Sequence, residues 1–120
     1  MKTLTIGDLK ARIPIIQGGM GVGISLSGLA SAVANEGGIG VISAAGLGLL
    51  YKKLSSNYTE AGNLGLAAEI RKAREKAKGI IGVNVMVALS DFAELVKTSI
   101  AEKWTLFLVE PGFRWIFPLS

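Results

Sequence analysis

Short apolar runs alternate with longer stretches of helical pattern along the chain. Four runs are almost continuously apolar and are bounded by glycine or polar residues, which is typical of strands buried on both faces. They cover residues 13–17, 39–43, 80–86 and 104–109. Pro14 stands near the start of the first run, where a strand tolerates proline. The pattern predicts the strands of a parallel sheet.

A first helix is predicted through residues 29–34, between the first two runs. Ser25 or Ser27 is expected to cap its N-terminus, because a hydroxyl oxygen can accept a hydrogen bond from a free backbone N–H. The pair Gly37-Gly38 is expected to end this helix.

The longest helix is predicted over residues 64–78, where alanine, leucine, glutamate, arginine and lysine dominate. Leu66, Ile70 and Ala73 share one face of this helix and are expected to point into the core. Residues 51–63 are polar and have no clear period, so we interpret them as an irregular excursion before the helix.

A third helix follows the third run, with Ser90 or Asp91 as the expected cap. Its expected inward-facing side chains are Phe92, Leu95, Val96 and Ile100.

The order of strands and helices indicates an α/β fold with right-handed crossovers, either a barrel or an open doubly wound sheet. A complete (β/α)8 barrel needs about 250 residues, and this sequence has 120. The chain therefore predicts the amino-terminal half of a TIM barrel, about four of its β/α units.

A glycine motif directly follows the first predicted strand, in the order Gln17-Gly18-Gly19-Met20-Gly21. Glycine lets the backbone approach a ligand closely, although a tight turn would need glycine as well. A Rossmann fingerprint is disfavoured, because its third glycine would have to stand where Ile24 or Leu26 is found.

Asn84 lies between two valines in the third predicted strand. A buried amide needs hydrogen-bond partners. A backbone group or a bound ligand could supply them.

Three segments, at residues 14–20, 32–43 and 82–86, together resemble the nitronate monooxygenase family and equally its relative, the flavin-dependent enoyl-acyl-carrier-protein reductase. The resemblance covers about residues 1–103. It implies a TIM barrel that binds FMN at the carboxyl ends of its strands. Its implied cofactor-binding residues are Gly18, Gly19, Met20, Gly21 and Asn84. In this family the phosphate loops and any catalytic histidine lie later in the barrel.

The resemblance implies FMN-dependent oxidation of alkyl nitronates with oxygen. The alternatives are reduction of an enoyl thioester through the same flavin, and a truncated, non-catalytic product. A small flavodoxin-like module ranks last. Its phosphate loop would have to lie at residues 21–25, and the sequence Gly21-Val22-Gly23-Ile24-Ser25 is only a weak candidate for such a loop. The expected partner is a small-molecule substrate, a nitronate or an enoyl thioester. We expect the present chain to be an inactive portion of the enzyme.

The amino-acid composition and the net charge exclude several other classes of function. The chain has no cysteine and no histidine, so we assign no metal site and no catalytic residue. The net charge is +4, and the basic stretch 71–78 has the spacing of a solvated helix face, which argues against nucleic-acid binding. Residues 13–35 carry no charge, but their glycines and Pro14 argue against a membrane span. With no signal-peptide pattern at the start, we expect a cytoplasmic location.

The composition changes after Lys103. Both tryptophans and three of the four phenylalanines lie beyond it. Reading the codons in a shifted frame can restore residues typical of the family, so we predict a frameshift. Residues 1–103 would form the barrel half, and residues 104–120 an atypical, out-of-frame tail. A half barrel exposes the edges of its first and fourth strands, which predicts self-association.

Overall fold

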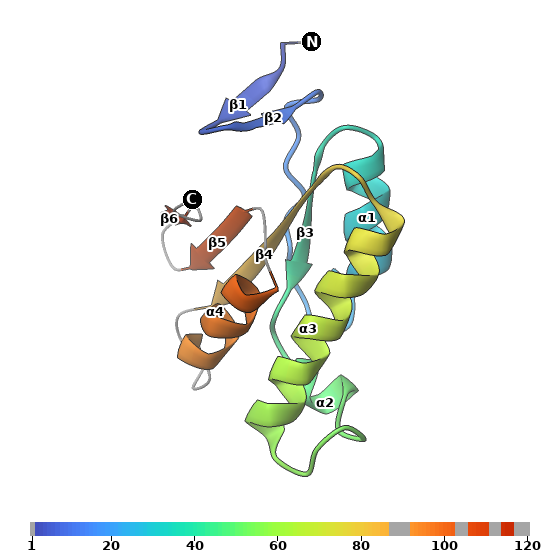
Figure 1. Cartoon of the computed structure of the whole chain (residues 1–120), viewed down its shortest axis with the longest axis vertical. Helices are drawn as coiled ribbons and strands as arrows, with labels where there is room; N and C mark the ends of the chain where they lie inside the picture. The colour runs from blue at the N-terminus through green and yellow to red at the C-terminus, as the bar shows by residue number, and fades with distance from the viewer. Residues whose placement is uncertain (1, 87–91, 103–105, 111–113, 117–120) are drawn as a thin grey trace.

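The computed structural model describes residues 2–86, 92–102, 106–110 and 114–116. The helices are α1 (Ser27–Asn35), α2 (Leu47–Leu50), α3 (Tyr58–Lys76) and α4 (Phe92–Ala101). The strands are β1 (Leu4–Ile6), β2 (Leu9–Ala11), β3 (Ile39–Ser43), β4 (Ile80–Met86), β5 (Leu106–Glu110) and β6 (Arg114–Ile116). Figure 1 shows the alternation of strands and helices that the apolar pattern predicted.

The main sheet has the strand order β3-β4-β5-β6. β3, β4 and β5 are parallel, with Ser43 opposite Asn84 and Met86 opposite Glu110. The predicted strands 39–43 and 80–86 are confirmed with the same bounds. The α/β class and the parallel sheet are therefore confirmed.

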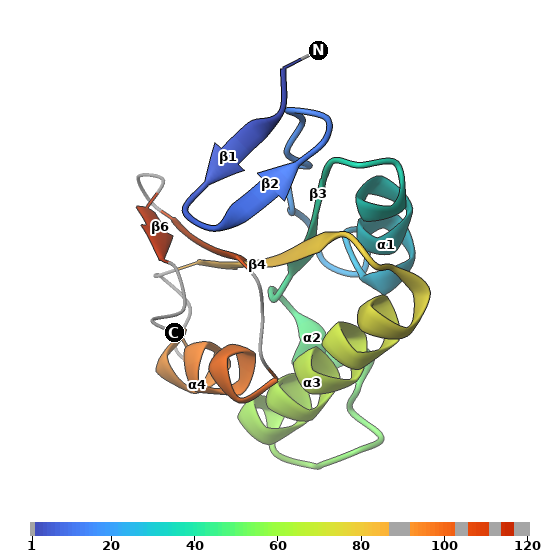
Figure 2. The ribbon, with the colours of Figure 1, turned by 45° about the horizontal axis from the view of Figure 1, so that its top comes forward.

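Helices and hairpin cover opposite faces of this sheet (Figure 2). On the helix face, Ile42 and Val83 belong to a core that α1, α3 and α4 complete. On the other face, Ile39 and Val41 pack with Ala11 and with neighbours from β1 and β2. Successive residues of a strand point to opposite faces, so one apolar run supplies both layers.

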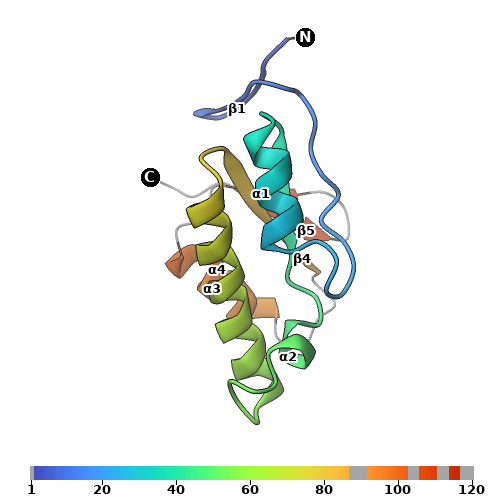
Figure 3. The same cartoon turned by 90° about the vertical axis from the view of Figure 1, so that its right-hand side faces the viewer.

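α1 and α3 lie side by side over the sheet (Figure 3). The predicted inward face of α3 is confirmed, since Leu66, Ile70 and Ala73 are all buried. Gly40 lets α1 approach β3 closely, because a side chain there would meet the backbone of Ala30.

The first predicted strand, 13–17, is reduced to one isolated parallel bridge between Ile16 and Ile39. Its backbone still bonds to β3: the Gln17 N–H donates to the Ile39 carbonyl at 3.0 Å, and the Ile39 N–H to the Ile15 carbonyl at 2.9 Å. The segment therefore lies where the first barrel strand was expected, but it pairs over a shorter length. The hairpin β1–β2 was not predicted, because strands of three residues are too short to show a period.

The helix ends depart from the predictions. α3 begins at Tyr58, so the excursion predicted for residues 51–63 is wrong in its last part. Asn57 caps this helix by accepting a hydrogen bond from the Glu60 N–H at 3.0 Å. The spacing of Asn57 and Glu60 is that of a capping box, and it was a sequence signal that periodicity alone does not reveal.

The prediction that Ser25 or Ser27 caps α1 is wrong, because the N-cap is Leu26 and no side chain of its own caps it. In α4 the predicted burial of Leu95 is confirmed and that of Ile100 is wrong, since Ile100 is 57% exposed. The predicted caps Ser90 and Asp91 lie outside the described residues.

The fourth predicted strand, 104–109, corresponds to β5, although residues 103–105 lie outside the described residues. β5 continues the sheet in parallel beside β4, and β6 then pairs with β5 in the antiparallel direction. The antiparallel β6 was not predicted, and it lies along the edge of β5 that was expected to be free.

None of the helices in the described part of the chain is both long and apolar enough to cross a membrane.

Residues 13–17 form the edge of the sheet at which we predict self-association. Ile15 is 55% exposed and lines an apolar hollow of about 310 Å³ together with Ile13 and Val33. We expect Ile15→Lys to shift the chain toward monomer in sedimentation velocity experiments, because a charge on a sheet edge opposes pairing. Leu54→Lys is the control, since Leu54 is 54% exposed and lies away from this edge. An unchanged sedimentation profile for Ile15→Lys would contradict the prediction.

Candidate functional site

Asn84 and the glycine motif meet on the face of the sheet that the helices do not cover. The Asn84 side chain is 6% exposed. Its Nδ2 donates a hydrogen bond to the Gly19 carbonyl oxygen at 2.7 Å and lies 3.5 Å from the Met20 sulfur. The structure thus brings Asn84 next to Gly19 and Met20, which lie 65 and 64 positions away in the chain.

The other end of the Asn84 amide, Oδ1, has no hydrogen-bond partner among the described residues. A carbonyl oxygen only accepts hydrogen bonds, so the contact with Gly19 fixes which end of the amide carries the NH2 group. Oδ1 is buried and accepts no hydrogen bond from any of the residues that the structure describes. An unpaired buried acceptor costs about 1–3 kcal/mol. The site therefore presents an acceptor that suits a ligand with an N–H or O–H group.

The glycine motif lies directly against β3. A Cβ on Gly19 would be 2.9 Å from the Val41 Cβ, so only glycine fits between the loop and the strand. Gly21 has a φ of 87°, which other residues rarely adopt. Gly18 has open space where a side chain would be, and Met20 is 51% exposed. Gly18 and Met20 are thus exposed, whereas Gly19 is buried between the loop and β3.

Two further residues, Gln17 and Ser25, attach the glycine loop to β3. The Gln17 Oε1 accepts a hydrogen bond from the Val41 N–H at 3.1 Å. The Ser25 hydroxyl donates to the Val41 carbonyl at 2.7 Å and accepts from the Gln17 Nε2. Gln17 was not among the predicted cofactor-binding residues, and Ser25 was predicted to cap a helix. A polar Gln17 at the end of an apolar run was the signal that could have found it.

A buried carboxylate holds the N-terminus of α1. Glu69 is 4% exposed, and its Oε1 accepts a hydrogen bond from the Ser27 N–H at 2.9 Å. Its Oε2 accepts from the Tyr51 hydroxyl, and the Lys72 Nζ lies 3.3 Å from the same oxygen. Burial by itself raises the pKa of Glu69, but these hydrogen bonds outweigh it and leave the pKa below its usual value. Burial and the bond to Glu69 raise the pKa of Tyr51.

The Glu69 carboxylate argues against a phosphate site at this helix end. A helix N-terminus attracts anions through its free N–H groups and its dipole. Here the Ser27 N–H already binds a carboxylate of the chain itself, and a second anion would be repelled. This geometry disfavours the flavodoxin-like alternative, which needs its phosphate loop between the first strand and α1.

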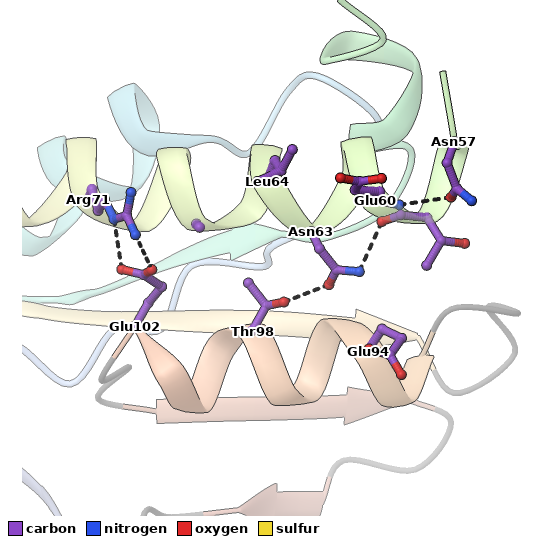
Figure 4. A pocket seen from close by; sticks show the side chains of 10 residues that line it. Asn57, Glu60, Asn63, Leu64, Arg71, Glu94, Thr98 and Glu102 are labelled. Carbon is purple, nitrogen blue, oxygen red and sulfur yellow. Dashed lines mark hydrogen bonds and ion pairs between the residues drawn. The ribbon is translucent and has the colours of Figure 1, made fainter. Parts of the chain in front are cut away.

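A groove of about 560 Å³ lies between α3 and α4, on the helix side of the sheet (Figure 4). Its walls are joined by the Arg71–Glu102 ion pair, with a nitrogen–oxygen distance of 2.6 Å. The Thr98 hydroxyl also donates to the Asn63 Oδ1 at 2.6 Å. None of the predicted site residues lines this groove, and Asn84 lies on the opposite face of the sheet. The groove is therefore separate from the candidate site.

The sequence matches the family described as nitronate monooxygenase over residues 2–117. The chain belongs to the nitronate monooxygenase family. A comparison with curated proteins found no match.

The structure resembles that of FabK from Thermotoga maritima, with a TM-score of 0.67 and 27% sequence identity. The similarity covers 82% of this chain and 27% of the FabK chain. The chain thus spans about a quarter of the length of that structure. The likeness confirms the predicted fold, a partial TIM barrel.

Membership of the nitronate monooxygenase family makes the chain part of an oxidoreductase family that is flavin-dependent in general. The family match runs past Lys103 to residue 117. The division into residues 1–103 and 104–120, and the frameshift between them, stay predictions.

The residues of the candidate site fit a flavin. The ring system of a flavin is flat and carries both an N–H donor and carbonyl acceptors. A Cβ on Gly18 would meet nothing within 4 Å, which leaves room beside the loop for a flat ring. The Asn84 Oδ1 accepts no hydrogen bond from the residues that the structure describes, so it offers an acceptor for a ring N–H. The site also lies toward the carboxyl ends of β3 and β4, where barrel enzymes carry their active sites. In Figure 1 the arrows of β3 and β4 point away from the hairpin and toward this end.

Proposed function

We propose that the chain supplies part of an FMN site, and that the protein oxidises alkyl nitronates with oxygen. The single observation that carries the proposal is the buried Asn84 Oδ1 beside the glycine motif, for which the described part of the chain supplies no donor. Membership of the nitronate monooxygenase family supports the choice of cofactor and substrate. Bound FMN would supply two-electron redox chemistry.

The residues of the chain would bind and orient the cofactor. Asn84 is held by its bond to the Gly19 carbonyl, so its Oδ1 is fixed in place before a ligand arrives. A preoriented acceptor binds more tightly than a mobile one, because less conformational entropy is lost on binding. Gly18, Gly19, Met20 and Gly21 would lie against the ring, and the open space at Gly18 would leave room for it.

Replacing Asn84 by alanine tests the cofactor proposal. We expect Asn84→Ala to weaken FMN binding by about tenfold, because a buried hydrogen bond contributes about 1 kcal/mol and the Gly19 carbonyl also loses its donor. The measurement is a titration of the purified chain with FMN, followed by flavin fluorescence and the visible spectrum.

Asn63→Ala is the matched control, because Asn63 is also a partly buried, hydrogen-bonded asparagine but lies in the groove between α3 and α4. It should leave FMN affinity unchanged. Equal affinities of wild type and Asn84→Ala would contradict the role of Asn84. A wild-type chain that binds no FMN would contradict the cofactor proposal itself.

A second candidate function is the reduction of an enoyl thioester at the same flavin site. The likeness to FabK is the observation that favours it. Oxygen consumption on addition of an alkyl nitronate would support the first function. Turnover of an enoyl thioester in the presence of a reductant would support the second.

A further inference from the structure

The edge of β3 is completed by side chains where the first strand stops. The backbone ladder between residues 13–17 and β3 ends with the Gln17 N–H bonded to the Ile39 carbonyl. In a regular parallel ladder the next bond would run from the Val41 N–H to the backbone carbonyl of Gln17. Here the Val41 N–H bonds to the Gln17 side chain instead, at 3.1 Å.

Ser25 continues this edge from the far side of the loop. Its hydroxyl bonds to the Val41 carbonyl at 2.7 Å, and its own carbonyl accepts a bond from the Ser43 N–H at 2.7 Å. The Gln17 Nε2 donates to the Ser25 hydroxyl, which joins the two ends of the loop directly. Ser25 is 1% exposed, so its hydroxyl bonds to the Val41 carbonyl where water does not compete.

Residues 18–24 leave the sheet without leaving the β3 edge unpaired. The loop can therefore rise over Val41 and place the Gly19 carbonyl next to Asn84. A buried backbone N–H or carbonyl needs a partner, and the two polar side chains provide one for each polar group of Val41.

We infer that Gln17 and Ser25 are positioning residues that hold the glycine loop in the conformation that binds the flavin. They act through the loop and through Val41. This inference rests on the proposed FMN site. If the pair acts as one unit, losing either residue frees the loop, and losing the second adds little.

The test compares Gln17→Leu, Ser25→Ala and the double variant, with FMN titration and amide hydrogen exchange as two readouts. We expect each single variant to weaken FMN binding by about tenfold, because the loop must then be ordered when the ligand binds. The double variant should weaken binding by much less than the product of the two single effects. In the ligand-free chain, the Val41 amide should exchange faster in all three variants.

Ser31→Ala is the matched control, because Ser31 is also buried, at 4% exposure, but its hydroxyl bonds within α1 to the Gly28 carbonyl. It should change neither FMN affinity nor exchange at Val41. Circular dichroism should show that each variant is folded. If Gln17→Leu does not fold, Ser25→Ala, which is the milder change, still tests the inference.

Unchanged FMN affinity in the single variants, or independent effects that multiply in the double variant, would overturn the inference while the proposed FMN site stands. The exchange measurement needs no flavin. If the Val41 amide exchanged as slowly in Gln17→Leu and Ser25→Ala as in the wild type, the inference would be overturned. A wild-type chain that binds no FMN would instead overturn the proposed function, and the pair would then have no flavin loop to position.

Discussion

Gly40→Ala is expected to destabilise the chain by about 3 kcal/mol or more, at the upper end of what overpacking costs. A Cβ on Gly40 would lie 2.6 Å from the carbonyl carbon of Ala30 and 2.9 Å from its Cα. Both are backbone atoms of α1, which cannot rotate away as a side chain can. The helix would have to move off β3, and the buried contacts between them would be lost. Urea unfolding followed by far-ultraviolet circular dichroism measures the change.

Gly28→Ala is the control, because Gly28 lies in α1 itself and an added Cβ would meet nothing within 4 Å. Alanine is favoured over glycine in a helix by about 1 kcal/mol, so this variant should be as stable as the wild type or more stable. A Gly40→Ala variant with a wild-type unfolding midpoint would show that α1 is not packed as closely as the structure has it.

Glu69→Ala is expected to lower the free energy of unfolding by about 2–4 kcal/mol at neutral pH. The estimate combines the loss of a helix cap with the loss of hydrogen bonds to a charged group. Glu69 is buried and binds the Ser27 N–H, the Tyr51 hydroxyl and Lys72. Removing it leaves the Ser27 N–H and the Tyr51 O–H without their acceptor. Urea unfolding at pH 7 measures the loss.

The same carboxylate predicts a pH dependence. The pKa of Glu69 is lower in the folded chain than its usual value, so its ionised form favours folding. This contribution is complete above the ordinary carboxyl pKa of about 4.3 and is lost as the pH falls through the lowered pKa of the folded state. Glu69→Gln does not titrate, so the stability gap between wild type and Glu69→Gln should narrow toward low pH.

Glu75→Gln is the control for both experiments, because Glu75 lies on the exposed side of the same helix. Its stability at pH 7 should stay within about 0.5 kcal/mol of the wild type. A Glu69→Gln variant whose deficit is constant from pH 7 to acid pH would contradict the role of the ionised carboxylate.

The sequence predicted best where a local pattern is sufficient. The strands 39–43 and 80–86 are continuous apolar runs, because they are covered on both faces. The buried face of α3 follows from helical spacing alone. The burial of the polar Asn84 also follows from its place in an apolar strand, whereas its contact with a flavin stays a prediction that the family resemblance implies.

Predictions from the sequence were less accurate where the position of a side chain depends on a partner far along the chain. Ser25 has the local features of a helix cap, but its hydroxyl bonds to Val41, 16 residues away. The true partner of the α1 N-terminus is Glu69, 42 residues from Ser27. Ile100 has helical spacing from Val96, yet α4 is rotated so that Ser99 is buried and Ile100 is exposed. A short helix does not carry enough apolar positions to specify its own rotation.

The amino-acid sequence by itself determined the α/β order, the position of the glycine motif and the place of Asn84 in a buried strand, because each depends on residue type and on spacing along one element. Only the tertiary structure decided which atom of Asn84 is left as a free acceptor, and that Gln17 and Ser25 complete the edge of β3. Those facts depend on which backbone groups of distant segments come within hydrogen-bonding distance. Spacing along the chain does not encode that distance, because it is set by how the glycine loop, β3 and β4 pack together.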